Sequence, residues 1–180
     1  MIRLFDFFLS LLGILVLSPL LVLLWIVNLL NNGSPLFKQP RVGRHKKPFI
    51  LIKFRTMPLS TKSVATHLVK NLNLNYFYTF LRNTRLDEIP QLWNVLIGEM
   101  SLVGPRPCLF NQKRLVIERQ KRGILKVRPG ITGLAQVLDI NMSTPTLLAK
   151  TDLKMIKQMN LFYYFYYIFK TVLLIIRKRS

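Results

Sequence analysis

The chain has 180 residues, with 27 Lys or Arg against 7 Asp or Glu, so its formal charge at pH 7 is +20. This length allows one domain with a real core but not two. The single cysteine excludes an internal disulfide framework, and the two isolated histidines argue against a zinc or haem site. Every basic residue except Arg3 follows Asn31. This excess favours anionic partners: phospholipid headgroups, nucleic acid or phosphorylated substrates.

The first predicted element is a membrane segment. Residues 7–27 carry no charge, and as a helix they would be about 30 Å long, close to one hydrocarbon core. Ser18 and Pro19 lie in its middle, where proline bends a helix and the serine can bond a freed carbonyl. Basic residues flank the run on both sides, which disfavours moving either flank across the bilayer. Two alternatives remain at this point: a re-entrant hairpin with both ends cytoplasmic, or a spanning helix with a kink.

The middle of the chain reads as a small soluble domain. Residues 49–54 predict a strand, and residues 58–75 predict a polar surface loop. Residues 76–97 predict helix, in which Thr84 and Asp87 resemble a capping box and Gly98 is a natural stop. One buried face is predicted at helical spacing, formed by Ile89, Leu92, Trp93 and Leu96. Pro90 then falls in the first turn, so Asp87 and Glu88 lie at the helix entrance.

Two later segments place an arginine among prolines and glycines: Gly104-Pro105-Arg106-Pro107 and Arg128-Pro129-Gly130. Proline fixes φ and glycine permits close approach of backbone to a ligand, so both arginines are predicted to be oriented for phosphate. Residues 111–126 predict a basic helix with a solvated or headgroup-facing surface. Residues 161–176 are rich in Tyr and Phe and predict a helix in the membrane interface, with a buried core helix as the alternative.

The stretch LRNTRLDEIPQLWNVLIGEMSLVGPRP at residues 81–107 resembles the bacterial sugar transferases, the small monotopic phosphoglycosyl transferases. Other parts agree in order: the Ser-Pro pair at 18–19, GSPLFKQPRVGR from Gly33, KFRTM at 53–57 and KVRPGITGLAQV at 126–137. The resemblance covers nearly the whole chain. It implies that Ser18 and Pro19 mark the break of a re-entrant helix.

The resemblance also implies a reaction. The family's catalytic Asp-Glu pair maps to Asp87 and Glu88. The aspartate would attack the sugar-bearing phosphate of a UDP-sugar, release UMP and carry the phosphosugar to a polyprenyl phosphate, usually undecaprenyl phosphate. Magnesium is required, and Asp87 and Glu88 are the expected ligands in a chain with so few acids. Mg²⁺ commonly uses one or two carboxylates together with substrate phosphates.

The remaining site predictions follow from charge. A diphosphate must be neutralised before an anionic nucleophile approaches it. The candidate phosphate ligands are Arg82, Arg106 and Arg128, with Lys53 and Arg55 as further cations. Gln136 is expected to contact the nucleotide or to brace its loop.

The expected architecture is mixed α/β and mostly helical. It has a re-entrant membrane helix at 1–32, a small cytoplasmic catalytic domain at 33–160 and an interfacial aromatic and basic helix at 161–180. The implied location is the cytoplasmic face of the bacterial inner membrane, with anionic phospholipid as a partner, no nucleic acid and a homodimer as one possible assembly.

Three segments depart from the family pattern: residues 57–60, residues 138–141, and Tyr164, where many relatives have an aspartate. The rival interpretations are an inactive relative that serves as a membrane scaffold for glycan assembly and a membrane-tethered nucleic-acid binder. No recognised nucleic-acid module supports the second.

Overall fold

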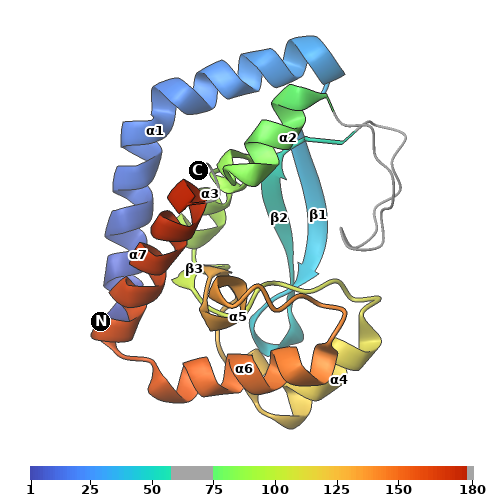
Figure 1. Cartoon of the computed structure of the whole chain (residues 1–180), viewed down its shortest axis with the longest axis vertical. Helices are drawn as coiled ribbons and strands as arrows, with labels where there is room; N and C mark the ends of the chain where they lie inside the picture. Colours follow the sequence, from blue (N-terminus) through green and yellow to red (C-terminus); the bar gives the residue numbers. More distant parts are fainter. Residues whose placement is uncertain (58–74, 178–180) are drawn as a thin grey trace.

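The computed structural model describes residues 1–57 and 75–177 and has the mixed, mostly helical fold that the sequence predicts. A long N-terminal helix borders the other helices and two small two-stranded sheets (Figure 1). The loop predicted at 58–75 lies outside the described residues except for its last position. The elements are α1 (Ile2–Asn32), β1 (Leu36–Val42), η1 (Arg44–Lys46), β2 (Pro48–Phe54), α2 (Tyr76–Asn83), η3 (Leu86–Glu88), α3 (Gln91–Leu96), β3 (Ser101–Val103), α4 (Lys113–Lys121), η4 (Ile124–Lys126), β4 (Gly130–Thr132), α5 (Leu134–Val137), α6 (Pro145–Gln158) and α7 (Leu161–Arg177).

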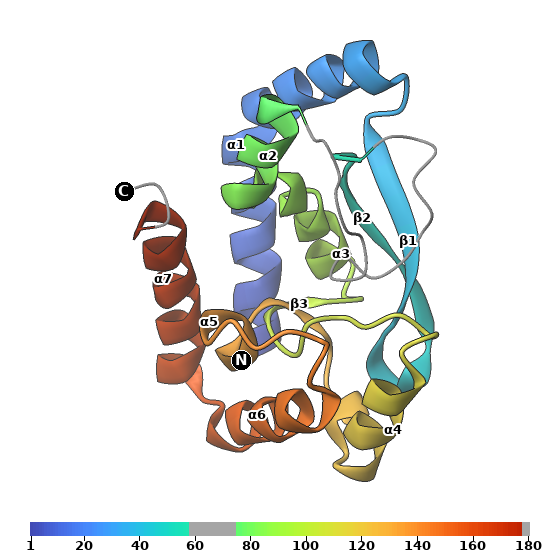
Figure 2. The same cartoon turned by 45° about the vertical axis from the view of Figure 1, so that its right-hand side comes forward.

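Helix α1 is bent, so its two arms run in different directions (Figures 1 and 2). Pro19 lies inside the helix and cannot donate to the carbonyl of Leu15. Ser18 Oγ donates to that same carbonyl over 2.8 Å, as the sequence predicts, and so replaces the missing hydrogen bond. By length and composition α1 could cross a membrane, and only 11% of its most apolar window is buried.

The first turn of α1 is fastened to the folded domain by Arg3. Its two terminal nitrogens donate to Val95 O over 2.5 Å and to Leu96 O over 2.7 Å. These carbonyls belong to the last turn of α3, where helix carbonyls lack their regular partners, although Val95 O also accepts from Gly98 N over 3.0 Å. A guanidinium therefore caps α3 from a residue far away in the sequence.

Asp6, one turn further along α1, is buried and forms a second attachment. Its Oδ1 accepts hydrogen bonds from Ser101 Oγ at 3.0 Å, from Leu102 N at 2.9 Å and from the hydroxyl of Tyr164 at 2.9 Å. The donors come from β3 and α7. Asp6 thus joins three elements, and its role is structural.

Strands β1 and β2 form an antiparallel hairpin that pairs Leu36 with Phe54, and β2 confirms the strand predicted at 49–54. Successive side chains of a strand point to opposite faces. Lys53 therefore shares a face with the buried Leu51, whereas Phe54 packs on the other face with Leu24 of α1. This alternation turns Lys53 away from α1.

The helix predicted at 76–97 is instead three short pieces, α2, η3 and α3, and the predicted capping box is wrong. Thr84 ends α2: its Oγ1 donates to Phe80 O over 2.7 Å rather than accepting from a following amide. Arg85 then adopts φ 55°, a left-handed conformation that breaks the helix. Gly98, with φ 90°, follows the end of α3 as predicted.

The predicted buried face of α3 is also wrong. The side chains buried in α3 are Gln91, Asn94 and Val95, and Trp93 is half exposed. Ile89 and Trp93 line an apolar hollow shared with α1. The buried polar residue is satisfied, because Asn94 donates to Ile50 O over 2.8 Å and to Glu99 over 2.7 Å. Apolar periodicity here marks the face toward α1, not the domain core.

Strands β3 and β4 pair in parallel, which brings the loop of Gly104-Pro105-Arg106 against the loop of Arg128-Pro129-Gly130. A Cβ added to Gly130 would lie 2.0 Å from the amide nitrogen of Gly104, so neither position accepts a side chain without movement. The glycines therefore permit the close packing of one loop on the other rather than the approach of a ligand.

Helices α4 and α6 are joined by a buried ion pair. Arg119 Nη2 lies 2.8 Å from Asp152 Oδ2, and both side chains are almost fully buried. Arg119 is thus not on a solvated face, in contrast to the prediction for residues 111–126. Asp152 therefore has a structural role.

Helix α7 is partly a core helix. Tyr164 and Tyr167 are buried in a cluster with Val103 and Met155, whereas Phe162, Phe169 and Ile176 are exposed. The helix therefore shares features of both alternatives drawn from the sequence. One stripe packs on the domain, and the rest is an apolar surface.

Candidate active site

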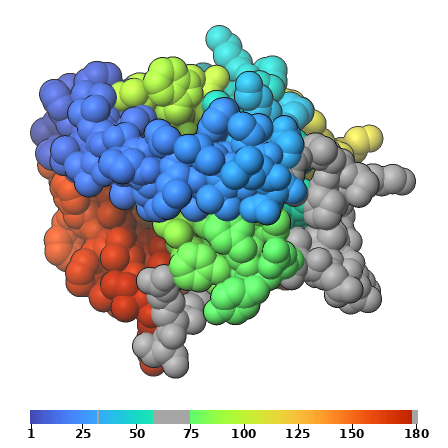
Figure 3. All heavy atoms as spheres, turned by 90° about the horizontal axis from the view of Figure 1, so that it is seen from above, coloured from blue at the N-terminus to red at the C-terminus, as the bar shows by residue number. Residues whose placement is uncertain are grey.

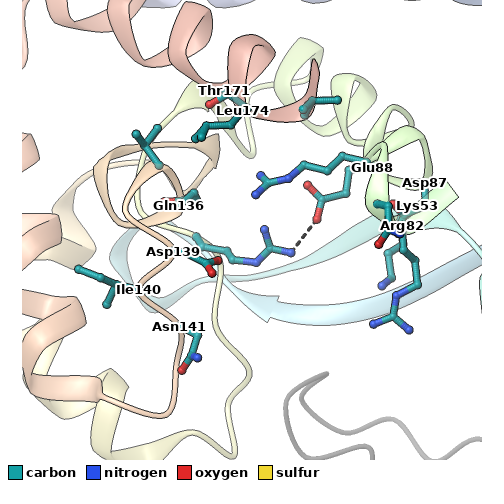
Figure 4. Close-up of a pocket in the computed structure, with 15 residues that line it drawn as sticks. Lys53, Arg82, Asp87, Glu88, Gln136, Asp139, Ile140, Asn141, Thr171 and Leu174 are labelled. Atoms are coloured by element: carbon teal, nitrogen blue, oxygen red, sulfur yellow. Dashed lines mark hydrogen bonds and ion pairs between the residues drawn. The ribbon is translucent and has the colours of Figure 1, made fainter. Parts of the chain in front are cut away.

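A pocket of about 390 Å³ contains the Asp-Glu pair and opens between two groups of elements (Figure 4). Lys53 of β2 and the residues from α2 to η3 form one side. Residues 136–141 and the second half of α7 form the other side. Its lining comprises Lys53, Arg82, Asn83, Arg85, Asp87, Glu88, Arg106, Gln136, Val137, Asp139, Ile140, Asn141, Thr171, Leu174 and Ile175. Segments from nearly the whole chain therefore meet at this point.

The short helix η3 positions the two acids. The left-handed Arg85 turns the chain, and Glu88 N then donates to Arg85 O over 3.0 Å. Asp87 is only 6% exposed. Burial and the neighbouring Glu88 raise the pKa of Asp87 to about 6, against the lowering effect of nearby cations. At neutral pH Asp87 is mainly an anion, and its charge is poorly solvated.

Glu88 is held by Arg106. Glu88 Oε1 lies 2.6 Å from Arg106 Nη2. Burial alone would raise the pKa of Glu88, but Arg106 and Arg85 outweigh it and the pKa falls below the usual value. The second oxygen, Oε2, is buried and has no hydrogen-bond partner among the described residues. An unpaired buried carboxylate oxygen is costly, so this atom is available to a cation or a donor supplied by a ligand.

The acids face several cations. Lys53 is largely buried, and desolvation lowers its pKa although Asp87 and Glu88 oppose the change. Arg82 and Arg85 lie beside the same pocket, and Nη1 of Arg85 is buried without a hydrogen-bond partner in the described part of the chain. The pocket therefore has more positive than negative groups, which suits a ligand with several negative charges.

The loop that carries Arg106 is fixed from behind by Arg119. Arg119 Nη1 donates to Arg106 O over 2.8 Å, while its other nitrogens bind Asp152. Sequence reasoning missed this role because a basic helix normally implies solvent. The buried Arg119–Asp152 ion pair is therefore connected to the pocket by the hydrogen bond to the carbonyl of Arg106.

Two predicted cations are not brought into the pocket. Arg55 lies over the ring of Phe37, 5.4 Å from its centroid, and does not line the pocket. Arg128 donates from Nε to Gly98 O over 2.7 Å and lies in a separate hollow with Arg3 and Arg44. Gly104 and Gly130 pack against each other, and the arginines of their two loops, Arg106 and Arg128, line different hollows.

Gln136 braces a loop, one of the two roles expected of it, and its contact with the nucleotide stays a prediction. Its Nε2 donates to Gly104 O over 3.2 Å and so braces the loop before Arg106. Its Oε1 is buried and has no hydrogen-bond partner among the described residues, although the residue itself lines the pocket. That oxygen can accept from a ligand.

The three segments that depart from the family pattern differ in their relation to the pocket. Residues 138–141 form part of the pocket wall: Asp139, with φ 54°, and Asn141 both line it. Tyr164 lies far from the acids in sequence and bonds the buried Asp6 instead. Residues 58–60 lie outside the described chain. The lining residues that were not predicted as site residues are Asn83, Arg85, Val137, Asp139, Ile140, Asn141, Thr171, Leu174 and Ile175.

The acids are suited to share a metal ion with a ligand rather than to enclose one. No group of three or more His, Cys, Asp or Glu residues gathers anywhere in residues 1–57 and 75–177. Two adjacent carboxylates, one with a free buried oxygen, match the small protein contribution that Mg²⁺ needs beside phosphate oxygens and water.

Comparison with known proteins identifies the class. A sequence model of the family described as bacterial sugar transferase matches residues 1–178, so the chain belongs to that family. The "Uncharacterized sugar transferase EpsL" of Bacillus subtilis is 43% identical over 136 residues, which are 75% of this chain and 67% of that protein.

Longer relatives have more specific names. The "Undecaprenyl-phosphate galactose phosphotransferase" of Salmonella typhimurium is 36% identical over 155 residues, 75% of this chain and 32% of that protein. The "UDP-glucose:undecaprenyl-phosphate glucose-1-phosphate transferase" of Escherichia coli K12 is 36% identical over 181 residues, 93% of this chain and 38% of that protein. The chain thus spans only about a third of the length of these relatives.

Proposed function

We propose that this chain transfers a sugar-1-phosphate from a UDP-sugar to undecaprenyl phosphate and releases UMP, in the first membrane step of glycan or glycoconjugate assembly. The main support is the buried carboxylate of Asp87, which lies in a pocket rich in cations. The same chain has an apolar helix, α1, that is long enough to cross a membrane. The names of the longer relatives support the donor and the acceptor.

In the first step, an oxygen of the Asp87 carboxylate attacks the sugar-bearing phosphorus of the donor. The bond from that phosphorus to the bridging oxygen breaks, and UMP leaves with the electron pair. In the second step, an oxygen of undecaprenyl phosphate attacks the same phosphorus and the Asp87 carboxylate leaves. The product is a polyprenyl diphosphate sugar. A carboxylate is a competent nucleophile for phosphoryl groups.

The cations make these attacks possible. Both substrates and the nucleophile are anionic, so their approach is repulsive until the charge is neutralised. Arg106, oriented by Glu88, has a planar fork suited to two phosphate oxygens. Lys53, Arg82 and Arg85 add charge on the side of Asp87.

The proposed metal ion is Mg²⁺, held by Asp87 and Glu88 together with substrate phosphate oxygens. When bound, it neutralises the diphosphate and stabilises the departing phosphate. Oε2 of Glu88 is the protein atom best suited to it, since that atom is buried and otherwise unpaired.

We further propose that α1 is re-entrant, with the catalytic domain on the cytoplasmic face of the inner membrane. Arg3 and Asp6 bind α3, β3 and α7 near the start of α1, and β1 of the same domain follows its end. A helix with both ends on one folded domain returns to the side from which it entered. The Pro19 bend and the exposed apolar surface of α1 support this arrangement.

A UMP-release assay over a panel of UDP-sugars, with undecaprenyl phosphate and Mg²⁺, tests the function. Wild type is expected to release UMP with at least one sugar, and Asp87→Asn to lose turnover because an amide is not a nucleophile here. Glu118→Gln, on α4 outside the pocket, is the matched control and keeps its rate. If Asp87→Asn released UMP at the wild-type rate, Asp87 would not be the nucleophile. A folded wild type that releases no UMP from any donor would favour the scaffold interpretation.

A further inference from the structure

The second half of α7 forms an aliphatic wall of the active-site pocket. In the first half, Tyr164 and Tyr167 are buried in the core. Beyond Thr171, whose hydroxyl hydrogen-bonds that of Thr132 on β4, Leu174 and Ile175 line the pocket. Figure 4 shows Thr171 and Leu174 across the pocket from Glu88. Both aliphatic side chains are partly exposed, so this wall has surface free to contact a ligand.

The pocket is therefore divided by chemistry. Arg82, Arg106 and Lys53 supply charge near the acids. Leu174 and Ile175, with Val137 and Ile140 opposite the cations, supply aliphatic surface. Such a pocket matches a ligand with an anionic end and an apolar chain. Of the two proposed substrates, only the polyprenyl phosphate has a hydrocarbon chain, because a UDP-sugar is polar throughout.

The outer surface of the same turns continues this apolar character. Val172, Leu173 and Ile176 are between 42% and 57% exposed. In Figure 3 the last turns of α7 reach the same face of the molecule as the second arm of α1. This outer surface of α7 is thus suited to contact lipid, next to the pocket-facing stripe that contains Leu174 and Ile175.

We propose that the pocket-facing side of the last turns of α7 is the acceptor subsite. Leu174 and Ile175 contact the first isoprene units of the polyprenyl phosphate while the arginines hold its phosphate. The subsite rests on the proposed function, since it names the place where that reaction's second substrate binds. It gives the C-terminal helix a role in acceptor selection besides membrane contact.

The test compares two leucines on adjacent positions of one helix. Leu174→Asn places an amide on the pocket wall, and Leu173→Asn makes the same change on the outer surface. Steady-state kinetics are measured in nanodiscs of constant lipid composition, with undecaprenyl phosphate and with the UDP-sugar varied in turn. Loss of one buried leucine contact is expected to raise the KM for undecaprenyl phosphate about tenfold in Leu174→Asn. The KM for the UDP-sugar is expected to change much less.

The outcomes separate the two proposals. Leu173→Asn is expected to keep its acceptor KM within about twofold, because exposed positions are usually tolerant. Equal acceptor KM values in the two variants, or an equal rise in both KM values of Leu174→Asn, would overturn the subsite while the function stands. Leu174→Met, which keeps volume and polarity, should restore the acceptor KM; if it does not, the wall is not an aliphatic contact. A wild type without UMP release would overturn the function itself, and the subsite with it.

Discussion

Asp87 and Glu88 are neighbours in sequence, but their surroundings shift their pKa values in opposite directions. Burial and the adjacent negative charge raise the pKa of Asp87, whereas Arg106 and Arg85 lower that of Glu88. Environments that separate two carboxylates in this way usually assign them different chemical roles. These surroundings suit the proposed roles, in which Asp87 is the nucleophile and Glu88 is the fixed anion that orients Arg106 and would help to hold the metal ion.

Arg106 and Arg128 have similar sequence contexts but different surroundings, and a pair of variants separates them. Arg106→Lys keeps the charge but loses the planar fork, so kcat/KM for the UDP-sugar is expected to fall about 100-fold. Arg128 lies outside the pocket, so kcat/KM for the UDP-sugar is expected to fall less than about tenfold in Arg128→Lys. Initial rates of UMP release measure both. An equal fall of kcat/KM in the two variants would mean that Arg128 also binds the substrate.

At the scale of elements, the strand at 49–54, the apolar N-terminal helix and the helical character of 76–97 could all be predicted from sequence pattern. The break at Arg85 could not, because a left-handed conformation is disfavoured for arginine and its local sequence does not indicate one. The same limit explains the error at Thr84. A Thr-x-x-Asp pattern fits a helix start, but the hydroxyl can also bond backward to end one.

The site was predictable where motif and chemistry coincide and not where it depends on packing. Asp87, Glu88, Arg82, Arg106, Lys53 and Gln136 all line the pocket. Arg128 was misplaced because nothing in the sequence reveals that its loop packs glycine to glycine against the loop of Arg106. The sequence did not predict that Leu174 and Ile175 of α7 line the pocket, because apolar periodicity does not show which residues of a helix face a pocket.

The buried ion pair between α4 and α6 predicts an unequal cost of mutation. Asp152→Ala leaves Arg119 buried without its partner, so the free energy of unfolding should fall by about 3–5 kcal/mol. Glu118→Ala removes the less buried pair with Arg122 and should cost about 0.5 kcal/mol. Urea unfolding in detergent measures both. Similar costs for the two variants would show that burial does not decide the contribution of the pair.

At the scale of the whole molecule, α1 begins and ends on one domain. Arg3 fastens its first turn to α3, and β1 follows its last turn after a short connection. Charge lies on both flanks, while the long exposed surface between them is apolar. This combination favours a helix that dips into one leaflet and returns.

Single-cysteine labelling tests this topology, since the natural Cys108 is buried and can be replaced by serine. Leu4→Cys and Asn31→Cys lie near opposite ends of α1, and Lys46→Cys marks the catalytic domain. An impermeant maleimide should modify all three in inverted vesicles and none in intact spheroplasts. Labelling of Leu4→Cys from the outer side alone would mean that α1 spans the bilayer.

In the proposed mechanism the carboxylate of Asp87 carries the phosphosugar. The mass of the intact chain tests this most directly. Wild-type chain mixed with its UDP-sugar and Mg²⁺, without acceptor, and quenched rapidly should gain the mass of one sugar phosphate. Fragmentation should locate the gain at Asp87, and added undecaprenyl phosphate should remove it. UMP release without any mass gain, or a gain on another residue, would contradict the account.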